Sequence, residues 1–305
     1  MAQVIDVRSE HTLARLLAQE ARGFSLELAT PAQLTELARL VAREDSLHYA
    51  TAIRACARLL PAEFDSEEFV QAHLEHLFWV EHRRALWRSG RIGSAESVGC
   101  RLHVEGRKNL EATSGYPTLL ITPMMLAYED ALWMTHALSG SREVALYGED
   151  LFEEGFFEEI AKILGLKNAR LVGGTPASAR DVLRTLRRNG LFLTYPDFVY
   201  RGHKAQYAQF FGMKWPFSSS FIALCAGSGN MLLPCHLRRE ANDLTIQFAK
   251  PIQVAALDEG AVDRRWVKHL MGATVARLLE EMILSNPAQW LLLLTLVTKP
   301  EQRAE

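Results

Sequence analysis

The hydrophobic positions change their spacing near residue 100. Before it, apolar residues recur every three or four positions, as in Leu34, Leu37 and Val41, which is typical of one face of a helix. Pro31 suits the first turn of that helix, and a second helix is expected to start at Asp65. The first third of the chain is therefore predicted to be helical.

After residue 100, short apolar runs alternate with helical stretches. The expected strands are Thr118–Thr122, Glu143–Tyr147, Ala169–Val172, Leu191–Thr194, Met231–Pro234 and Leu244–Phe248. The expected helices are Leu126–Ala137, Phe152–Leu164, Ser178–Asn189, Phe221–Ala226 and Val262–Ser285. Because this alternation is typical of parallel strands covered by helices, we expect an α/β fold with a mixed, mostly parallel sheet flanked by helices. We expect a single domain, residues 1–305, in which a mainly helical region, residues 1–100, packs on an α/β core, residues 101–305.

Charge and cysteine spacing narrow the class of protein. The 34 Lys and Arg residues are interspersed with 36 Asp and Glu residues, so a nucleic-acid-binding surface is not expected. None of the four cysteines forms a CxxC pair, which favours reduced thiols in the cytoplasm. Residues 1–21 contain no apolar run typical of a signal peptide, and the run Trp290–Val297 is far shorter than the ~20 residues that span a bilayer. We expect a cytoplasmic protein with at most peripheral membrane contact.

Six segments carry short motifs in a fixed order. They are Arg101–Thr122, Gly190–Asp197 (GLFLTYPD), Phe210–Gly212 (FFG), Pro216–Pro234, Asp243–Pro251 (DLTIQFAKP) and Leu279–Trp290 (LEEMILSNPAQW). In this order the chain resembles the bacterial lipid A late acyltransferases, within the wider lysophospholipid-acyltransferase-like superfamily. The resemblance covers most of the chain, from Leu59 to Val297, and its most distinctive part is the last segment.

The resemblance implies acyl transfer from a thioester to an amine or hydroxyl acceptor. The donor would be an acyl carrier protein or acyl-coenzyme A, so the phosphopantetheine arm would belong to the substrate and no cofactor would stay bound. A specialised pathway such as natural-product biosynthesis is one setting for a divergent relative. No metal site is implied.

Two departures from the family pattern bear on catalysis. Family members place His-x4-Asp/Glu directly after the first strand, and here Met124 takes the position of the histidine and Glu129 that of the acidic residue. A methionine has no titratable proton, so Met124 cannot act as the base that histidine supplies near neutral pH. The membrane helix that usually precedes the family's catalytic region is also not seen in this sequence.

Two carboxyl groups are the candidate catalytic residues. Glu129 could act as an acid or base if desolvation raised its pKa, and an amine acceptor would ease the reaction. It could equally be a polar residue held by an arginine, while its neighbour Asp130 is expected on a solvated helix face. Asp197 ends a strand at the edge where open α/β sheets build their sites, although a capping role would also explain it.

The resemblance assigns Met124, Tyr128, Phe210 and Gly212 to substrate binding. Arg170 is a further candidate, because a guanidinium suits the phosphate of a pantetheine arm or headgroup. The basic residues that follow it could serve the same purpose or could form a solvated helix face.

Histidines and arginines in the first third allow functional readings that we do not favour. His73 and His76 have spacing that could hold a metal, but we expect a solvated helix face. Arg83 and Arg84 lie among tryptophans and could dock a carrier protein or membrane, but we expect them in solvent. The leading hypothesis is therefore an acyltransferase-like enzyme. Its alternatives are a degenerate homologue that binds an acyl chain, lipid or carrier protein, and a different thioester reaction in the same pocket.

Overall fold

A computed structural model describes the chain over residues 28–44, 49–61, 64, 66–90, 100–147, 168–172, 176–198, 205–225, 229–253, 264–294 and 296. The expected helix Phe152–Leu164 lies outside these residues.

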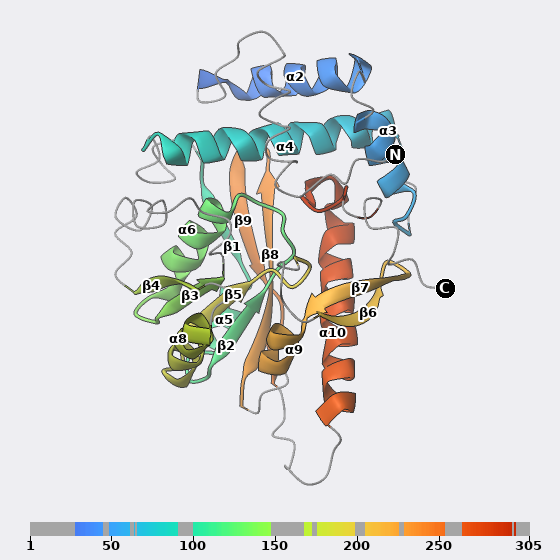
Figure 1. Ribbon diagram of the computed structural model, residues 1–305. Helices are drawn as coiled ribbons and strands as arrows, with labels where there is room; N and C mark the ends of the chain where they lie inside the picture. Colours follow the sequence, from blue (N-terminus) through green and yellow to red (C-terminus); the bar gives the residue numbers. More distant parts are fainter. Residues whose placement is uncertain are drawn as a thin grey trace.

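The described part of the N-terminal region is helical, as predicted. It contains α2 (Pro31–Glu44), α3 (Tyr49–Ala57) and α4 (Glu67–Arg88). Figure 1 shows α2 and α4 lying side by side across the top of the sheet. The cap of α4 is Ser66, whose hydroxyl accepts the Phe69 N–H at 3.2 Å, so the helix starts just after the expected Asp65.

The prediction that α4 turns His73, His76, Arg83 and Arg84 toward solvent is wrong. His73 and His76 are 1% and 2% exposed, and both arginines are buried. Helix α4 is covered on one side by α2. On the other side it contacts α6 and the turn η4 (Pro287–Gln289), so its middle turns present no face to solvent.

The central sheet has the order β1-β9-β8-β2-β5-β3-β4, with β10 paired to β8. Its strands are β1 (Leu102–Glu105), β2 (Thr118–Ile121), β3 (Val144–Tyr147), β4 (Ala169–Val172), β5 (Leu191–Thr194), β8 (Met231–Glu240), β9 (Asp243–Phe248) and β10 (Ile252–Gln253). The pairs β2–β5, β2–β8, β3–β5, β3–β4 and β1–β9 are parallel, whereas β8 pairs antiparallel with β9 and β10. The expected mixed, mostly parallel sheet is confirmed.

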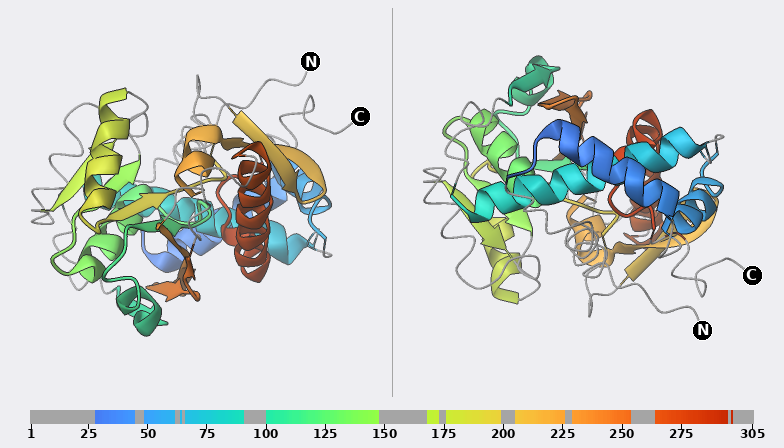
Figure 2. Two further views of the ribbon diagram at one scale, coloured as in Figure 1. Left: turned by 90° about the horizontal axis from the view of Figure 1, so that it is seen from below. Right: turned by 90° about the horizontal axis from the view of Figure 1, so that it is seen from above.

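Helices cover both faces of this sheet. Figure 2 shows α6 (Tyr128–Ser139) on one face and α8 (Pro176–Arg187) on the other. Every residue of β2 and β5 is therefore buried, which explains why these strands read as continuous apolar runs instead of alternating patterns.

A hairpin and a long helix stand beside the sheet. The hairpin pairs β6 (Ala205–Phe210) with β7 (Met213–Ser218), and β6 packs on α10 (Arg264–Ser285), with α9 (Ser219–Cys225) between hairpin and sheet (Figure 1). Its turn is made by Phe211 and Gly212, whose φ values of 49° and 70° lie in the left-handed region. The two strands of this hairpin were not expected from the sequence.

Candidate functional site

The loop after β2 leads into α6 and is buried throughout. Its main chain is held from three directions around Met124. The N–H of Met124 donates to Asp197 Oδ2 at 3.0 Å, and its carbonyl oxygen accepts the Leu291 N–H at 2.9 Å. His76 Nε2 lies 2.6 Å from the Met125 carbonyl oxygen, which can only accept, so this imidazole carries its proton on Nε2. The loop is therefore fixed by α4, by the end of β5 and by the C-terminal segment.

Asp197 is the point where these parts meet. Its Oδ2 also accepts the Trp290 Nε1–H at 2.8 Å, and its main-chain oxygen accepts the Trp215 Nε1–H at 3.3 Å. Its Oδ1 accepts no hydrogen bond from the described residues. Desolvation raises the pKa of Asp197 to about 6, although the donors from Met124 and Trp290 oppose the shift.

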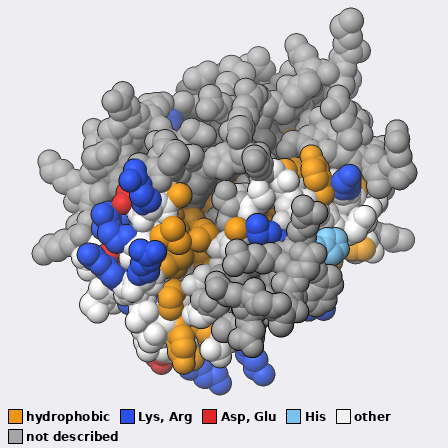
Figure 3. Space-filling view, turned by 60° about the horizontal axis from the view of Figure 1, so that its bottom comes forward, with side chains coloured by type: hydrophobic (Ala, Val, Ile, Leu, Met, Phe, Trp, Pro, Cys, Tyr) orange, Lys and Arg blue, Asp and Glu red, His pale blue; other side chains and the backbone are white. Residues whose placement is uncertain are grey.

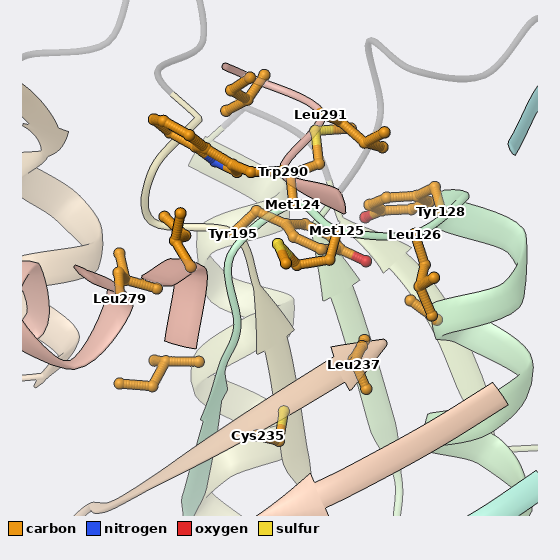
Figure 4. Packing of buried hydrophobic residues seen from close by; sticks show 14 of the residues in the cluster. Met124, Met125, Leu126, Tyr128, Tyr195, Cys235, Leu237, Leu279, Trp290 and Leu291 are labelled. Carbon is orange, nitrogen blue, oxygen red and sulfur yellow. The ribbon is translucent and has the colours of Figure 1, made fainter. Parts of the chain in front are cut away.

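Apolar and aromatic side chains surround this point. Figure 4 shows Met124, Met125, Leu126, Tyr128, Tyr195, Trp290 and Leu291 gathered above the strand ends. The rings of Tyr128 and Tyr195 lie 5.3 Å apart, and Phe210 lies 5.8 Å from Trp290, edge to face. Of the residues that the sequence assigned to substrate binding, Met124, Tyr128 and Phe210 are therefore brought to one apolar cluster.

Glu129 lies in the first turn of α6 and is 3% exposed. Its Oε2 is 3.8 Å from Arg84 Nε, whereas Arg84 Nη1 bonds Glu81 Oε1 at 2.8 Å. Desolvation raises the pKa of Glu129, and Arg84 partly offsets this. Glu129 is thus a buried carboxyl group, and the arginine nearest to it, Arg84, lies closer to Glu81 than to Glu129.

Asp130 has a different environment from the one predicted. It is fully buried instead of solvated. Arg83 donates to it in bidentate fashion, with Nη2 to Oδ1 at 2.5 Å and Nε to Oδ2 at 3.1 Å, and the Trp87 Nε1–H donates to Oδ1 at 2.9 Å. The solvated prediction failed because α4, which supplies both donors, packs directly on α6.

The C-terminal segment Leu279–Trp290 owes its pattern to contacts with four other parts of the fold. Glu280 accepts the main-chain N–H of Phe211 in the hairpin turn. Gln289 exchanges two hydrogen bonds with the main chain of Arg239, at 2.9 and 2.8 Å, and the Ala288 carbonyl oxygen lies 2.8 Å from His73 Nδ1 on α4. Together with the Trp290 bond to Asp197, these contacts connect the C-terminal segment to the hairpin, to β8, to α4 and to the end of β5.

Comparisons with known proteins find similarity in structure but not in sequence. No protein-family model and no curated protein sequence matches this chain. The structure is similar to the crystal structure of a 1-acyl-sn-glycerophosphate acyltransferase, PlsC, from Thermotoga maritima. The similarity covers 82% of this chain and 96% of that one, with a TM-score of 0.35 and 13% identity. At this level it says nothing about the reaction.

Arg170 and Gly212 lie apart from the Met124 loop. Arg170 is on edge strand β4, which β3 and β5 separate from β2, and its guanidinium faces Glu143 at 3.7 Å and Asp181 at 4.0 Å. Gly212 is exposed at the tip of the hairpin. The structure therefore does not bring these two residues to the cluster around Met124.

The basic residues of α8 form part of the surface. Arg180, Arg184 and Arg187 are exposed together with Leu183. Figure 3 shows Lys and Arg side chains beside a band of apolar ones on this side of the molecule. Arg184 is paired with Asp181 at 2.6 Å.

Metal ligands do not gather in the described part of the chain: no three His, Cys, Asp or Glu side chains there could hold an ion. None of the described helices is long and apolar enough to cross a bilayer.

Sequence reasoning missed three groups that build the site. Trp290, Leu291 and His76 all bond the Met124 loop or Asp197. A signal existed for Trp290, which ends the most distinctive motif of the sequence. No local pattern shows that α4 returns to the carboxyl ends of the strands.

Proposed function

We propose that the chain transfers an acyl group from a carrier-protein or coenzyme A thioester to an amine or hydroxyl acceptor. One observation carries this proposal: the Asp197 carboxylate bonds the main chain of Met124. This bond joins the segment around Met124 to the segment that ends at Asp197. Both segments resemble parts of the site of one acyltransferase family, although they lie far apart in the chain. They meet at the carboxyl ends of β2 and β5, the edge where open α/β sheets build their sites.

The chemistry of acyl transfer fits the groups around this bond. The acceptor must lose a proton as it attacks the thioester carbonyl, and Asp197 and Glu129 are buried carboxyl groups whose pKa values burial raises. The cluster of methionine and aromatic side chains suits an acyl chain, because thioethers adapt their shape to apolar ligands. From the sequence alone we also propose one domain of residues 1–305, a cytoplasmic setting and a specialised pathway such as natural-product biosynthesis.

A second candidate function is binding of an acyl chain or acyl carrier without turnover. It is favoured by the burial of Met124, which is 1% exposed where the motif would place a base. The Leu291 N–H bond to its carbonyl oxygen holds the C-terminal segment against the loop.

Intact-mass analysis separates the two candidates. The full chain is incubated with a panel of acyl-carrier-protein and acyl-coenzyme A thioesters, with and without amine and alcohol acceptors. Acceptor-dependent loss of the acyl group from the thioester supports transfer. Thioesters that stay intact with every acceptor, while the protein retains an acyl carrier or acyl chain, support binding and contradict transfer.

A further inference from the structure

We propose that Asp197 takes the place of the absent histidine as the proton acceptor and that Trp290 is the residue that positions it. This inference rests on the proposed acyl transfer and names the groups that would move the proton. The geometry around the carboxylate carries it.

The two oxygens of Asp197 have different surroundings. Oδ2 accepts N–H groups from Met124 at 3.0 Å and from Trp290 at 2.8 Å, so the carboxylate is held from two directions. Oδ1 is buried and accepts no hydrogen bond from the described residues. A carboxylate oriented through one oxygen has its other oxygen available for a proton from a bound acceptor.

Asp197 lies beside the residue that replaces the missing histidine. Its carboxylate bonds the main chain of Met124, the residue that stands where the resemblance expects the histidine. Because Asp197 is 1% exposed, an acceptor reaches Oδ1 only after part of the surrounding structure moves. Hydrogen bonds to a catalytic base commonly form only in the substrate complex.

The other titratable groups nearby are poorer proton acceptors. Burial raises the pKa of Glu129 as well, but Arg84, whose Nε lies 3.8 Å from Glu129 Oε2, partly offsets the shift. His76 bonds the same loop, but burial lowers its pKa to about 3, so it is a weak base. The residues that hydrogen-bond Asp197 in the described part of the chain, Met124, Trp215 and Trp290, are uncharged.

In the proposed acyl transfer, the proton taken from the acceptor is returned to the leaving group. The acceptor nitrogen or oxygen forms a bond to the thioester carbonyl carbon while its proton passes to Asp197 Oδ1. The tetrahedral intermediate then expels the thiolate by cleavage of the C–S bond, and the proton passes from Asp197 to the sulfur. The products are an amide or ester and a free thiol, and Asp197 returns to its carboxylate form.

Trp290 acts through Asp197 and not on the substrate. Its indole N–H stabilises the charged carboxylate and lowers the pKa of Asp197. Without that N–H, the pKa of Asp197 rises, so the base is protonated up to a higher pH. A role in packing alone would not move a pH profile.

The test measures the pH dependence of kcat/KM for thioester turnover in four variants and the wild type. Asp197→Asn keeps an oxygen that can accept the Met124 and Trp290 N–H groups but removes the base. Asp181→Asn, which changes a partly exposed carboxylate of α8, is its control. Trp290→Phe removes the N–H, and Trp79→Phe, a buried tryptophan of α4, is its control. Circular dichroism and thermal melting confirm that each variant folds.

The expected result is a loss of about 100-fold or more for Asp197→Asn, the scale of a general base, with Asp181→Asn unchanged. The acid limb of the profile moves to higher pH in Trp290→Phe and stays in place in Trp79→Phe. Turnover that persists at the wild-type rate in folded Asp197→Asn overturns this inference and leaves acyl transfer standing. No turnover by the wild type with any thioester overturns both.

Discussion

Two buried aspartates of this fold each accept an indole N–H, yet their surroundings differ. Asp130 on α6 receives Trp87 and a bidentate guanidinium from Arg83. Asp197 at the end of β5 receives Trp290 and a main-chain N–H, with no cation among the residues that hydrogen-bond it in the described chain. Burial raises the pKa of Asp197 to about 6.

The difference predicts a structural role for Asp130 and, for Asp197, the proton uptake that the proposed reaction needs. The charge of Asp130 is matched by Arg83, so removing either partner leaves an uncompensated charge in the interior. Among the described residues, the carboxylate of Asp197 accepts hydrogen bonds from uncharged N–H groups alone, and its Oδ1 accepts none. Asp130 is therefore expected to hold α4 to α6, whereas Asp197 keeps the capacity to take up a proton near neutral pH.

The largest expected effect is the loss of Asp130. Asp130→Ala strands the buried guanidinium of Arg83, and we expect the free energy of unfolding to fall by about 3–5 kcal/mol. Urea denaturation followed by circular dichroism measures the change. Asp181→Ala removes a carboxylate from a more exposed pair with Arg184 and should cost under about 1 kcal/mol. Equal losses in the two variants would show that the Arg83–Asp130 pair does not stabilise the fold.

The second effect concerns the pH dependence of stability through Asp197. Moving its pKa from 3.8 to about 6 corresponds to about 3 kcal/mol between the two protonation states. The folded protein binds this proton more tightly than the unfolded chain, so the contribution is fully present below pH 3.8 and is lost as the pH rises through about 6.

Asp197→Asn should lack this dependence. The difference in unfolding free energy between wild type and Asp197→Asn is therefore expected to favour the wild type increasingly as the pH falls from 7 toward 4, by up to about 3 kcal/mol. Urea titrations at several pH values give this difference, in which the other carboxylates largely cancel. A difference that is constant across this range would contradict a raised pKa at Asp197.

The sequence predicted the buried strands of the sheet better than the edge strand β1 and the hairpin. The run Leu191–Thr194 was predicted with the observed bounds, because a parallel strand buried on both faces is continuously apolar. The edge strand Ala169–Val172 was also predicted with the observed bounds. The hairpin strand Ala205–Phe210 was missed, since its mixture of polar and apolar residues gives no such run. The strand Leu102–Glu105 was missed for a similar reason: its exposure alternates at the edge of the sheet.

The site depends on contacts that no local pattern encodes. The sequence suggested Met124 and Asp197 through a resemblance, but not the bond between them. It assigned Asp130 to solvent because an acidic residue early in a helix is usually exposed. Only the return of α4 across the strand ends, with Arg83 and Trp87, explains its burial.

The third effect compares the two indoles directly. Trp87→Phe removes one hydrogen bond to the Asp130 carboxylate, which keeps its pair with the Arg83 guanidinium, and we expect a loss of about 2 kcal/mol. Trp290→Phe should cost more at pH 8, where Asp197 is ionised, than at pH 5, where it is protonated. Unfolding free energies at both pH values test this contrast. Identical pH dependence in the two variants would remove the distinction between the aspartates.

The smallest effect is expected at Glu129, which lies between the two cases. Its Oε2 is 3.8 Å from Arg84 Nε, and Arg84 already bonds Glu81 at 2.8 Å. Glu129→Gln should therefore change the free energy of unfolding by less than about 1 kcal/mol, because no short ion pair is broken. Glu81→Gln, the matched control, breaks the shorter bond to the same arginine and should cost more. If Glu129→Gln instead lost as much as Asp130→Ala, Glu129 would be the charge partner that Arg84 needs, and its carboxylate would belong with Asp130 as a structural group.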